Sequence, residues 1–590
     1  MVLSDFLFIL KWWLVIFTIG AVFLPLTIKL LGNFFDKGYL FSKVIGIIII
    51  SYAVFLLSLS HILPFTALTI SGLILVSFAV NLILFRRGFL TIIKKMLPIF
   101  LFEETIFLLG IFVWAFVKSH APDIHGLEKF MDFGFINSIL RSNYFPPRDM
   151  WFSPYPINYY YFGHLTTAVL TKISTIPSSV TYNLMLATLF SFTFSLSFSI
   201  GSNLISFLFQ KQDIKRESKK INFSKHITII ISGLFTGLLV SLSGNLQTVY
   251  AFFTNFSSEN PLPIWRLIFS PLTFPNNYWY PNATRFISHT IHEFPSYSFV
   301  VSDLHGHVLD IPIVLLTLAV FLNGFNKLTK RTSIFLLLFI SFLLAVMYMT
   351  NAWDGLIYFI FAGVIFLGLV FHSLYISSEN RFTIFDAGKY LLILGVGFFM
   401  FLLPFSLNFK PFVSGVGILC MPEFLIKLNK IGPFLFEAFH CQKSPWWQIL
   451  TLHGFFYFFV FSFLIFLTSK IKIKNSYFKI KNILPTDGYI LVLIIISTIL
   501  VIIPEIAYVK DIYPEHYRAN TMFKLTYQEF IMLSIASSYI LVRLILNFKR
   551  NIKKNKLLIP FILVSLFILT LVFTYPFFSI GSYFNNLKIN

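Results

Sequence analysis

The amino-acid sequence predicts an all-α, polytopic integral membrane protein with about 14 transmembrane helices. Of its 590 residues, 57% are hydrophobic and only 12% are charged, which is about half the charged fraction of a soluble domain. Apolar runs of about 20 residues, the length that crosses the hydrocarbon core of a bilayer, recur along the whole chain. Lysine and arginine gather in the short stretches between these runs, as they do on the cytoplasmic side of membrane proteins.

The net charge and the cysteine content exclude some kinds of partner and binding site. A net charge of +21 would suggest nucleic-acid binding in a soluble protein, but here the basic residues mark cytoplasmic loops, so no nucleic-acid partner is expected. Two cysteines, Cys420 and Cys441, are too few for a disulfide framework or a zinc site. Both fall in one loop, so they could form a single disulfide or remain two separate thiols.

The apolar segments can be assigned in chain order. The first, Phe6–Leu31, is too long for the core of a cleavable signal peptide, so it is assigned as the first span. Tyr159–Ile176 is also apolar, but counting it as a span would place the basic residues 211–220 outside. We therefore expect a helix that lies at the membrane surface or dips into it. The 14 expected spans lie near residues 7–31, 39–60, 64–85, 96–117, 178–209, 227–253, 309–325, 333–350, 356–377, 390–407, 447–468, 488–504, 526–546 and 557–576.

This order of spans places both termini outside, together with the loops that hold the unusual residues. The expected regions are N-terminal transmembrane helices (1–95), a transmembrane region with the polar motifs (96–546), and a basic cytoplasmic loop with the last helix (547–590). The outer loops are 118–177, 254–308, 351–355, 408–446 and 505–525.

The first outer loop carries two carboxylates, Glu128 and Asp132. They are four residues apart, so on a helix they share one face. Such a pair, just beyond a membrane span, suits a general base beside a second acid or a metal ligand. The alternative is an ordinary solvated helix face. The same loop ends in an aromatic and histidine motif that holds Tyr159, Tyr160, Tyr161 and His164.

The second large outer loop carries candidate metal ligands. Asp303, His305 and His307 stand on alternate residues, which face the same way if the backbone is extended. Such a set could bind a divalent cation, with imidazoles favouring manganese or zinc over magnesium, or it could bind phosphate without metal. Alternatively, the histidines only cap a helix. Arg285 and Glu293 belong to the same loop.

Two further outer motifs hold polar residues between spans. The short loop after the eighth span contains Asn351, Trp353 and Asp354, of which the tryptophan suits ordinary interfacial anchoring. The last outer motif runs from Arg518 to Lys524 and includes Asn520.

Arg518 and Lys524 are expected on the outer side of the membrane, where positively charged residues are disfavoured. We therefore expect them to have an anionic partner. Arg518 can grip a phosphate with two parallel hydrogen bonds, with Lys524 as a point charge. Pairing with Glu515 or with lipid headgroups is the alternative. Glu103 and Glu104, inside the fourth span, should face the bundle interior or a cavity.

Taken together, these motifs resemble the YYY-domain membrane proteins, an uncharacterised family named for its tyrosine run. The resemblance covers roughly residues 96–546. It rests on Glu128-Lys-Phe-Met-Asp132, Phe145-Pro-Pro-Arg-Asp149-Met-Trp151, Ile157-Asn-Tyr-Tyr-Tyr-Phe-Gly-His164, Glu293-Phe-Pro, Asp303-Leu-His305-Gly-His307, Asn351-Ala-Trp-Asp354 and Arg518-Ala-Asn-Thr-Met-Phe-Lys524.

That family in turn is similar to the GT-C glycosyltransferases, which take a sugar from a polyprenyl-phosphate carrier at the outer face of a membrane. The resemblance implies a GT-C-like fold with juxtamembrane helices in the first outer loop. By position it places Glu128 where those enzymes keep their catalytic acid, although that acid is usually Asp and often paired. Asp132 therefore stays a rival for the general base.

The function expected from this resemblance is inverting transfer of a sugar to a lipid, glycan or protein acceptor. Glu128 or Asp132 would act as the base, and Arg518, Lys524 and Arg285 would bind phosphate, with Mg²⁺ or Mn²⁺ at Asp303, His305 and His307. The remaining candidates would contact substrate: Tyr159, Tyr160, Tyr161, His164, Glu293, Asn351, Trp353, Asp354 and Asn520. The expected location is the cell membrane, with the active site on the extracytoplasmic side. The alternative is a transporter or flippase of a lipid-linked or anionic solute.

Overall fold

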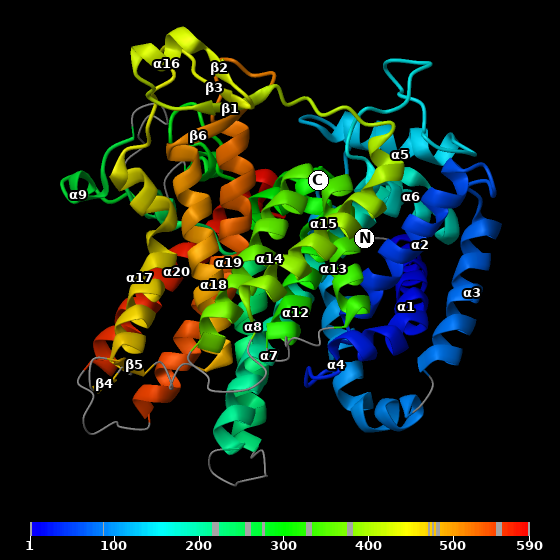
Figure 1. Cartoon of the computed structure of the whole chain (residues 1–590), viewed down its shortest axis with the longest axis horizontal. Coiled ribbons are helices and arrows are strands. Elements are labelled where there is room, and N and C mark those ends of the chain that lie inside the picture. Colours follow the sequence, from blue (N-terminus) through cyan, green and yellow to red (C-terminus); the bar gives the residue numbers. More distant parts are fainter. Residues whose placement is uncertain are drawn as a thin grey trace. The chain divides into compact units, whose positions relative to one another are not determined.

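The computed structural model describes residues 3–85, 88–214, 223–253, 261–273, 278–325, 333–374, 382–469, 472–474, 477–479, 484–549 and 557–587. Much of the basic loops expected on the cytoplasmic side, including Lys327 to Arg331 and most of 549–556, lies outside these residues. The described chain is predominantly helical, which confirms the all-α class (Figure 1).

Long apolar helices account for the expected spans. Among the described residues, 13 helices are long and apolar enough to cross a membrane. A further apolar helix of 17 residues, Ile334–Thr350, coincides with the expected span at 333–350. All 14 expected segments therefore coincide with apolar helices, because length and hydropathy fix these elements before any packing does.

The chain divides into two compact units. The three consecutive regions expected from the sequence stay a prediction. Unit 1 comprises residues 1–237, 302–410 and 484–489, and unit 2 comprises residues 238–301, 411–483 and 490–590. The boundaries fall within two helices, α8 (Phe223–Leu242) and α18 (Pro485–Ile502).

Unit 1 is a helical bundle in which α7 packs along α4 and α12, and α1 packs along α2. Two shorter helices, α5 and α6, lie at one end of its long helices (Figure 1). The helices that lie wholly within this unit are α1 (Leu3–Leu31), α2 (Phe41–Leu59), α3 (Ala67–Phe85), α4 (Phe89–Lys118), α5 (Lys129–Arg141), α6 (Phe162–Ser174), α7 (Ser178–Ile214), α11 (Gly306–Leu309), α12 (Ile311–Phe325), α13 (Ile334–Thr350), α14 (Ala352–Leu374) and α15 (Ile384–Ser406).

Helix α6 corresponds to the apolar segment that was not counted as a span. It has 13 residues, too few to cross a bilayer. Its side chains are nearly all buried, since it packs against α1, α2, α3, α7 and α13. The segment is therefore a short helix buried inside unit 1, and its position at the membrane surface stays a prediction.

Unit 2 combines helices with short strands. Its helices are η1 (Leu246–Phe252), α9 (Ile264–Leu267), η2 (Tyr280–Thr284), α10 (Pro295–Val301), α16 (Glu423–Leu428), α17 (Trp446–Thr468), η3 (Ile503–Glu505), α19 (Ala519–Lys549), α20 (Leu558–Tyr583) and η5 (Asn585–Leu587). The span expected to run to residue 253 ends at Leu242, and Asn245 then caps η1 by accepting a hydrogen bond from the Gln247 N–H.

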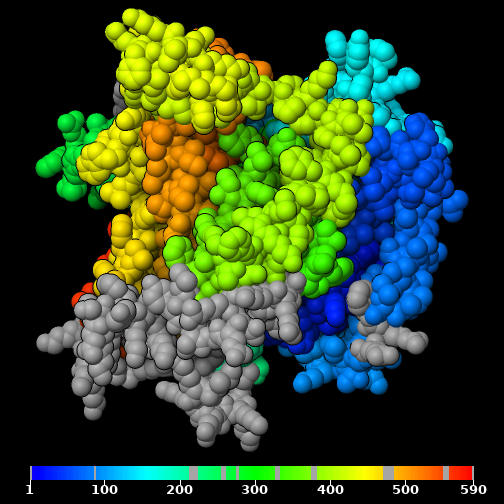
Figure 2. Space-filling view, in the orientation of Figure 1, coloured from blue at the N-terminus to red at the C-terminus, as the bar shows by residue number. Residues whose placement is uncertain are grey.

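The small sheet in unit 2 was not expected from the sequence. Strands β1 (Gly415–Ile418), β2 (Lys430–Ile431), β3 (Phe434–Leu435) and β6 (Ala507–Lys510) form a four-stranded sheet in the order β2-β3-β1-β6. β1 runs parallel to β3 and antiparallel to β6, with Val416 opposite Val509. The sheet therefore joins the loop 408–446 to the loop 505–525, and in Figure 2 the yellow side chains of the first form a continuous surface beside the orange segment. A separate hairpin pairs β4 (Lys472–Lys474) with β5 (Tyr477–Lys479).

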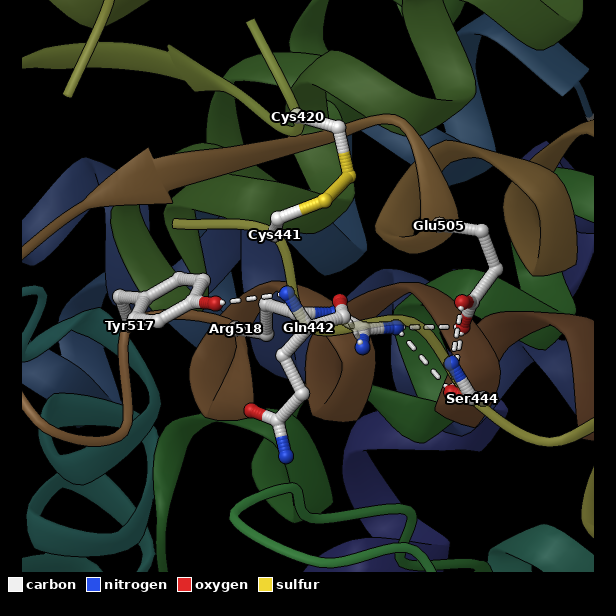
Figure 3. The surroundings of a disulfide bond; sticks show 7 residues. All are labelled: Cys420, Cys441, Gln442, Ser444, Glu505, Tyr517 and Arg518. Carbon is white, nitrogen blue, oxygen red and sulfur yellow. Dashed lines mark hydrogen bonds and ion pairs between the residues drawn. A yellow bond between two sulfur atoms is a disulfide. The ribbon is translucent and has the colours of Figure 1, made fainter. Parts of the chain in front are cut away.

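The disulfide left open by the sequence is formed. Cys420 and Cys441 are bonded, with their Cα atoms 4.3 Å apart (Figure 3). The bond closes a loop that contains α16, β2 and β3, and β1 ends just before its first cysteine.

Candidate functional site

A carboxylate, an imidazole and a phenol come together at the α5 end of unit 1. The Oε2 atom of Glu128 forms an ion-pair contact with Nδ1 of His305. The opposite ring nitrogen of His305, Nε2, lies 3.3 Å from the hydroxyl of Tyr159. The side chain of Glu128 is 53% exposed, whereas that of His305 is only 10% exposed. A carboxylate that is open to solvent is thus oriented by a buried imidazole.

Local backbone structure explains how Glu128 reaches His305. Gly126 and Leu127 both have positive φ and form a turn directly before α5. Glu128 is the N-cap residue of α5, yet its side chain makes no capping hydrogen bond. The carboxylate is therefore available for His305 instead of the helix end.

Gly306 allows the chain around His305 to pack closely. A Cβ atom at Gly306 would lie 2.4 Å from the carbonyl oxygen of Thr350 and 2.8 Å from the Tyr160 ring. Only glycine fits at this distance, so α11 can approach the end of α13 and bring His305 beside the tyrosines.

The three consecutive tyrosines precede α6 and do not lie within a helix, which corrects the expectation that they are helical. The rings of Tyr159 and Tyr160 pack together with centroids 4.0 Å apart, and both face His305. Tyr161 packs instead against Phe405 of α15. Burial, with the nearby carboxylates Glu128 and Asp132, raises the pKa of Tyr159 and of Tyr160, so both remain neutral hydroxyl groups.

The second acid of α5 is in a different environment. Asp132 Oδ1 lies 3.0 Å from His164 Nε2, and both side chains are 0% exposed. Phe135 covers the pair by packing edge-on against His164. Asp132 therefore joins α5 to α6 in the interior, while Glu128 faces outward.

The proposed metal ligands are only partly gathered. The rings of His305 and His307 lie 5.1 Å apart, and Asp303 is close enough to Lys118 for their charges to interact. Within the residues that the structure describes, no group of three or more His, Cys, Asp or Glu side chains is placed to hold a metal ion. The geometry gives no support to a metal at Asp303, His305 and His307, and that site stays a prediction.

The short motif after α13 forms the start of α14. Asn351 Nδ2 donates a hydrogen bond of 2.8 Å to Asp354 Oδ2, and both side chains are buried. Trp353 is partly exposed. The carboxyl groups of Asp354 and Asp310, on α14 and at the start of α12, are also in hydrogen-bonding contact. Asp310 was not singled out from the sequence, because a lone Asp at the start of an apolar run looks like a helix cap.

The candidate phosphate ligand Arg518 lies in unit 2, where each guanidinium nitrogen has a partner. Figure 3 shows its contacts with Ser444 and Glu505. Its Nε donates to the carbonyl oxygen of Pro504, its Nη1 to that of Gln442, and its Nη2 to Ser444 and Glu505. Its acidic partner is thus Glu505, not the Glu515 considered from the sequence. Phosphate binding by Arg518 stays a prediction that would require some of these bonds to be exchanged.

The other unit 2 candidates also have internal contacts. Asn520 donates to Asp511, and the ammonium group of Lys524 lies 4.5 Å from the centroid of the Phe523 ring. Arg285, whose side chain is 40% exposed, pairs with Glu293 at 3.0 Å.

Glu293 also lines a small cavity within unit 2. The cavity-lining residues are Asn245, His292, Glu293, Phe294, Leu452, His453, Thr526, Glu529 and Phe530. His453 contacts Glu529 at 3.2 Å. Burial, followed by the charges of Arg285 and His453, lowers the pKa of His292, whose Nε2 accepts a hydrogen bond from the Phe286 N–H.

The predicted site residues therefore fall into two groups. Glu128, Tyr159, Tyr160 and His305 meet within unit 1, whereas the proposed phosphate ligands belong to unit 2. The meeting of all these groups in one pocket stays a prediction.

Comparison with known proteins identifies the family. A family model described as "Uncharacterized membrane protein (DUF2298)" matches residues 49–486 and 476–533, which is well over half of the chain. No curated protein matches the chain, and no solved structure matches it. The chain therefore belongs to the DUF2298 family of uncharacterized membrane proteins.

Proposed function

We propose that this membrane protein is a glycosyltransferase that moves a sugar from a polyprenyl-phosphate donor to an acceptor hydroxyl. The observation that carries the proposal is the Glu128–His305–Tyr159 arrangement, in which an exposed carboxylate is held by a buried imidazole. The resemblance of the surrounding motifs to YYY-domain proteins, and of these to GT-C enzymes, supplies the reaction class. The proposed acceptor is a lipid, a glycan or a protein.

The proposed reaction is a single inverting displacement. The acceptor oxygen gives its proton to Glu128 and bonds to the anomeric carbon, while the bond from that carbon to the phosphate oxygen breaks. The polyprenyl phosphate leaves with the electron pair. His305 keeps the carboxylate oriented, and the neutral hydroxyls of Tyr159 and Tyr160 can donate hydrogen bonds to the sugar.

The geometry favours Glu128 over Asp132 as the base. A general base must come within about 3 Å of the proton that it removes. The side chain of Asp132 is fully buried and bonded to His164, so an acceptor could reach it only if α5 and α6 separated. Glu128 can be reached without such a change.

Two observations support an extracytoplasmic site in the cell membrane. The Cys420–Cys441 disulfide is of the kind that persists in oxidising compartments. The sequence also concentrates lysine and arginine in the stretches between spans that alternate with the motif-bearing loops.

The test is sugar transfer from a labelled polyprenyl-phosphate sugar by the purified protein and by its Glu128→Gln variant. Loss of a general base should lower the rate about 10²- to 10⁴-fold, with little change in stability because the side chain is half exposed. The matched control is Asp123→Asn, which removes an exposed carboxylate from the same loop. Transfer that survives in Glu128→Gln would contradict the assignment, whatever the rate of Asp123→Asn.

A transporter is the second candidate, because unit 1 buries acids within its spans. Glu103 and Glu104 of α4 are buried, and Glu103 contacts Asp36. Glu104, however, is paired with Lys43 at 2.6 Å and accepts a hydrogen bond from Tyr39, as expected of a structural group. Transport of a lipid-linked solute should survive Glu128→Gln, whereas transferase activity should not.

A further inference from the structure

We propose that Asp310, Asp354 and Asn351 form a binding site for one divalent cation of the Ca²⁺ or Mg²⁺ type in unit 1. The site is separate from the metal set expected at Asp303, His305 and His307. It does not depend on the transferase proposal, because its basis is the placement of buried oxygen atoms alone.

Two carboxylates are in contact at this position. The side chains of Asp310 and Asp354 are both 0% exposed, and their carboxyl groups lie within hydrogen-bonding distance of each other. The charged group that acts on Asp310 is the carboxyl group of Asp354. Two negative charges this close cannot both persist in a dry interior unless a proton or a cation neutralises them.

The side chain of Asn351 contacts one member of the pair. The side chain of Asn351 is 1% exposed, and its Nδ2 donates to Asp354 Oδ2. The remaining atom of this amide, Oδ1, is buried and accepts no hydrogen bond. Both carboxyl oxygens of Asp310 are likewise buried and receive no N–H or O–H donor within normal hydrogen-bond geometry.

A bound cation would satisfy these oxygens better than a proton shared between the two carboxyl groups. One proton between the carboxyl groups satisfies a single oxygen on each side and leaves the Asn351 amide oxygen unsatisfied, at a cost of about 1–3 kcal/mol for each buried polar group. A cation accepts electron pairs from several oxygens at once. Carboxylate and amide oxygens are the ligands that Ca²⁺ and Mg²⁺ prefer, and two carboxylates match a charge of two.

The site would join elements distant in sequence. Asp310 stands at the start of α12, Asn351 follows α13, and Asp354 lies in the first turn of α14. Asp354 is also near enough to Tyr160 for their charges to interact. Binding should therefore stabilise unit 1 next to the Glu128–His305 cluster.

The test uses the full chain, purified in detergent, treated with EDTA and then dialysed against CaCl₂ or MgCl₂ in separate experiments. We expect one bound cation per chain by mass spectrometry of the metal, and a higher unfolding temperature that EDTA reverses. Asp310→Asn should weaken binding at least about tenfold, and Asn351→Leu should also weaken it. Asp123→Asn, the exposed control, should bind as the wild type does.

Failure of the wild-type protein to bind either cation at millimolar concentration would overturn the proposal, and this result needs no variant to fold. Unchanged affinity in Asp310→Asn would overturn it too. Glu128→Gln separates the two proposals, since that variant should keep cation binding while it loses sugar transfer.

Discussion

At the scale of single residues, the two acids at the start of α5 differ in their surroundings although they are only four residues apart. Glu128 is half exposed and oriented by His305, whereas Asp132 is buried with His164. Helical spacing alone places both on one side, but it does not tell which acid meets solvent. The difference in exposure comes from their partners: Asp132 contacts His164 of α6, and Glu128 contacts His305, directly before α11.

The buried pair gives a prediction about stability. Replacing Asp132 by Ala leaves the His164 ring in the interior without its partner, at a cost of about 3–5 kcal/mol if the pair is charged or about 1–3 kcal/mol if it is neutral. The unfolding temperature of the purified protein should fall accordingly, and Asp132→Asn, which can keep one hydrogen bond, should lose less. If Asp132→Asn abolishes transfer while its stability stays intact, Asp132 and not Glu128 is the base.

At the scale of elements, the small sheet of unit 2 is held by a polar cluster at its edge. Glu437 contacts Lys510 and accepts a hydrogen bond of 2.6 Å from Tyr508, and the ring of His440 stacks on Tyr517. Burial disfavours the Glu437 carboxylate, but the hydrogen bonds from Lys510 and Tyr508 outweigh it and lower its pKa. Burial, aided by Lys510 and opposed by Glu437, lowers the pKa of His440.

This cluster predicts that acid weakens the sheet. The pKa of His440 in the folded protein lies below 6.5, the ordinary value for histidine. The stability that neutral His440 contributes to the fold is therefore present above pH 6.5 and is lost as the pH falls below it. The lowered pKa of Glu437 means that its contribution to stability is also lost on acidification, at pH values below about 4.5. Hydrogen exchange at β1 and β6 should therefore become less protected from pH 7 to pH 5. His440→Asn should remove this loss of protection between pH 7 and pH 5, whereas Glu437→Gln should retain it. Equal protection of the wild-type protein at both pH values would contradict the role of His440.

The disulfide gives a second prediction for this element. It joins cysteines 21 residues apart, and a loop of that size is stabilised by about 3 kcal/mol through lost freedom of the unfolded chain. Cys420→Ser should therefore raise hydrogen exchange and protease cleavage in residues 415–441. Cys441→Ser and the double variant should match it, because each breaks the same bond. Maleimide labelling of both cysteines in the unreduced, denatured protein would show that the bond is not formed.

The helices of this protein were predictable, and the sheet was not. Apolar length alone marks a span, so each of the 14 segments coincides with a helix. The strands β2 and β3 have two residues each, too short for any alternation of apolar and polar positions. Likewise, α6 was recognised as apolar, but only its packing shows that protein rather than lipid surrounds it.

At the scale of the whole molecule, the candidate site depends on contacts between distant parts of the chain. The sequence named Glu128, Tyr159 and His305 separately, and the structure brings them together. Their meeting depends on the turn at Gly126 and the close approach at Gly306, which no spacing rule reveals. The partner of Arg518 was missed for the same reason, because Glu505 reaches it through the fold of unit 2.

The longest helix among the described residues bears on the orientation of the chain in the membrane. Helix α7 has 37 residues and, at about 1.5 Å per residue, extends about 55 Å, well beyond the hydrocarbon thickness of about 30 Å. Its two ends must therefore lie on opposite sides. The side chain of Asn183, near its first turn, donates to the carbonyl oxygen of Pro122, so Asp123 lies at the first end. Ser224 lies beyond the second end, in the stretch that is rich in lysine.

The positive-inside pattern then predicts which end faces the cytoplasm. In a background with both native cysteines replaced by serine, Asp123→Cys should react with a membrane-impermeant maleimide in intact cells. Ser224→Cys should react only after the membrane is opened, because the basic residues around it keep that end inside. Both positions are exposed, so a difference in labelling reports the side and not burial. Labelling of Ser224→Cys but not Asp123→Cys in intact cells would place the Glu128–His305 cluster in the cytoplasm, and a donor presented at the outer face could then not reach it.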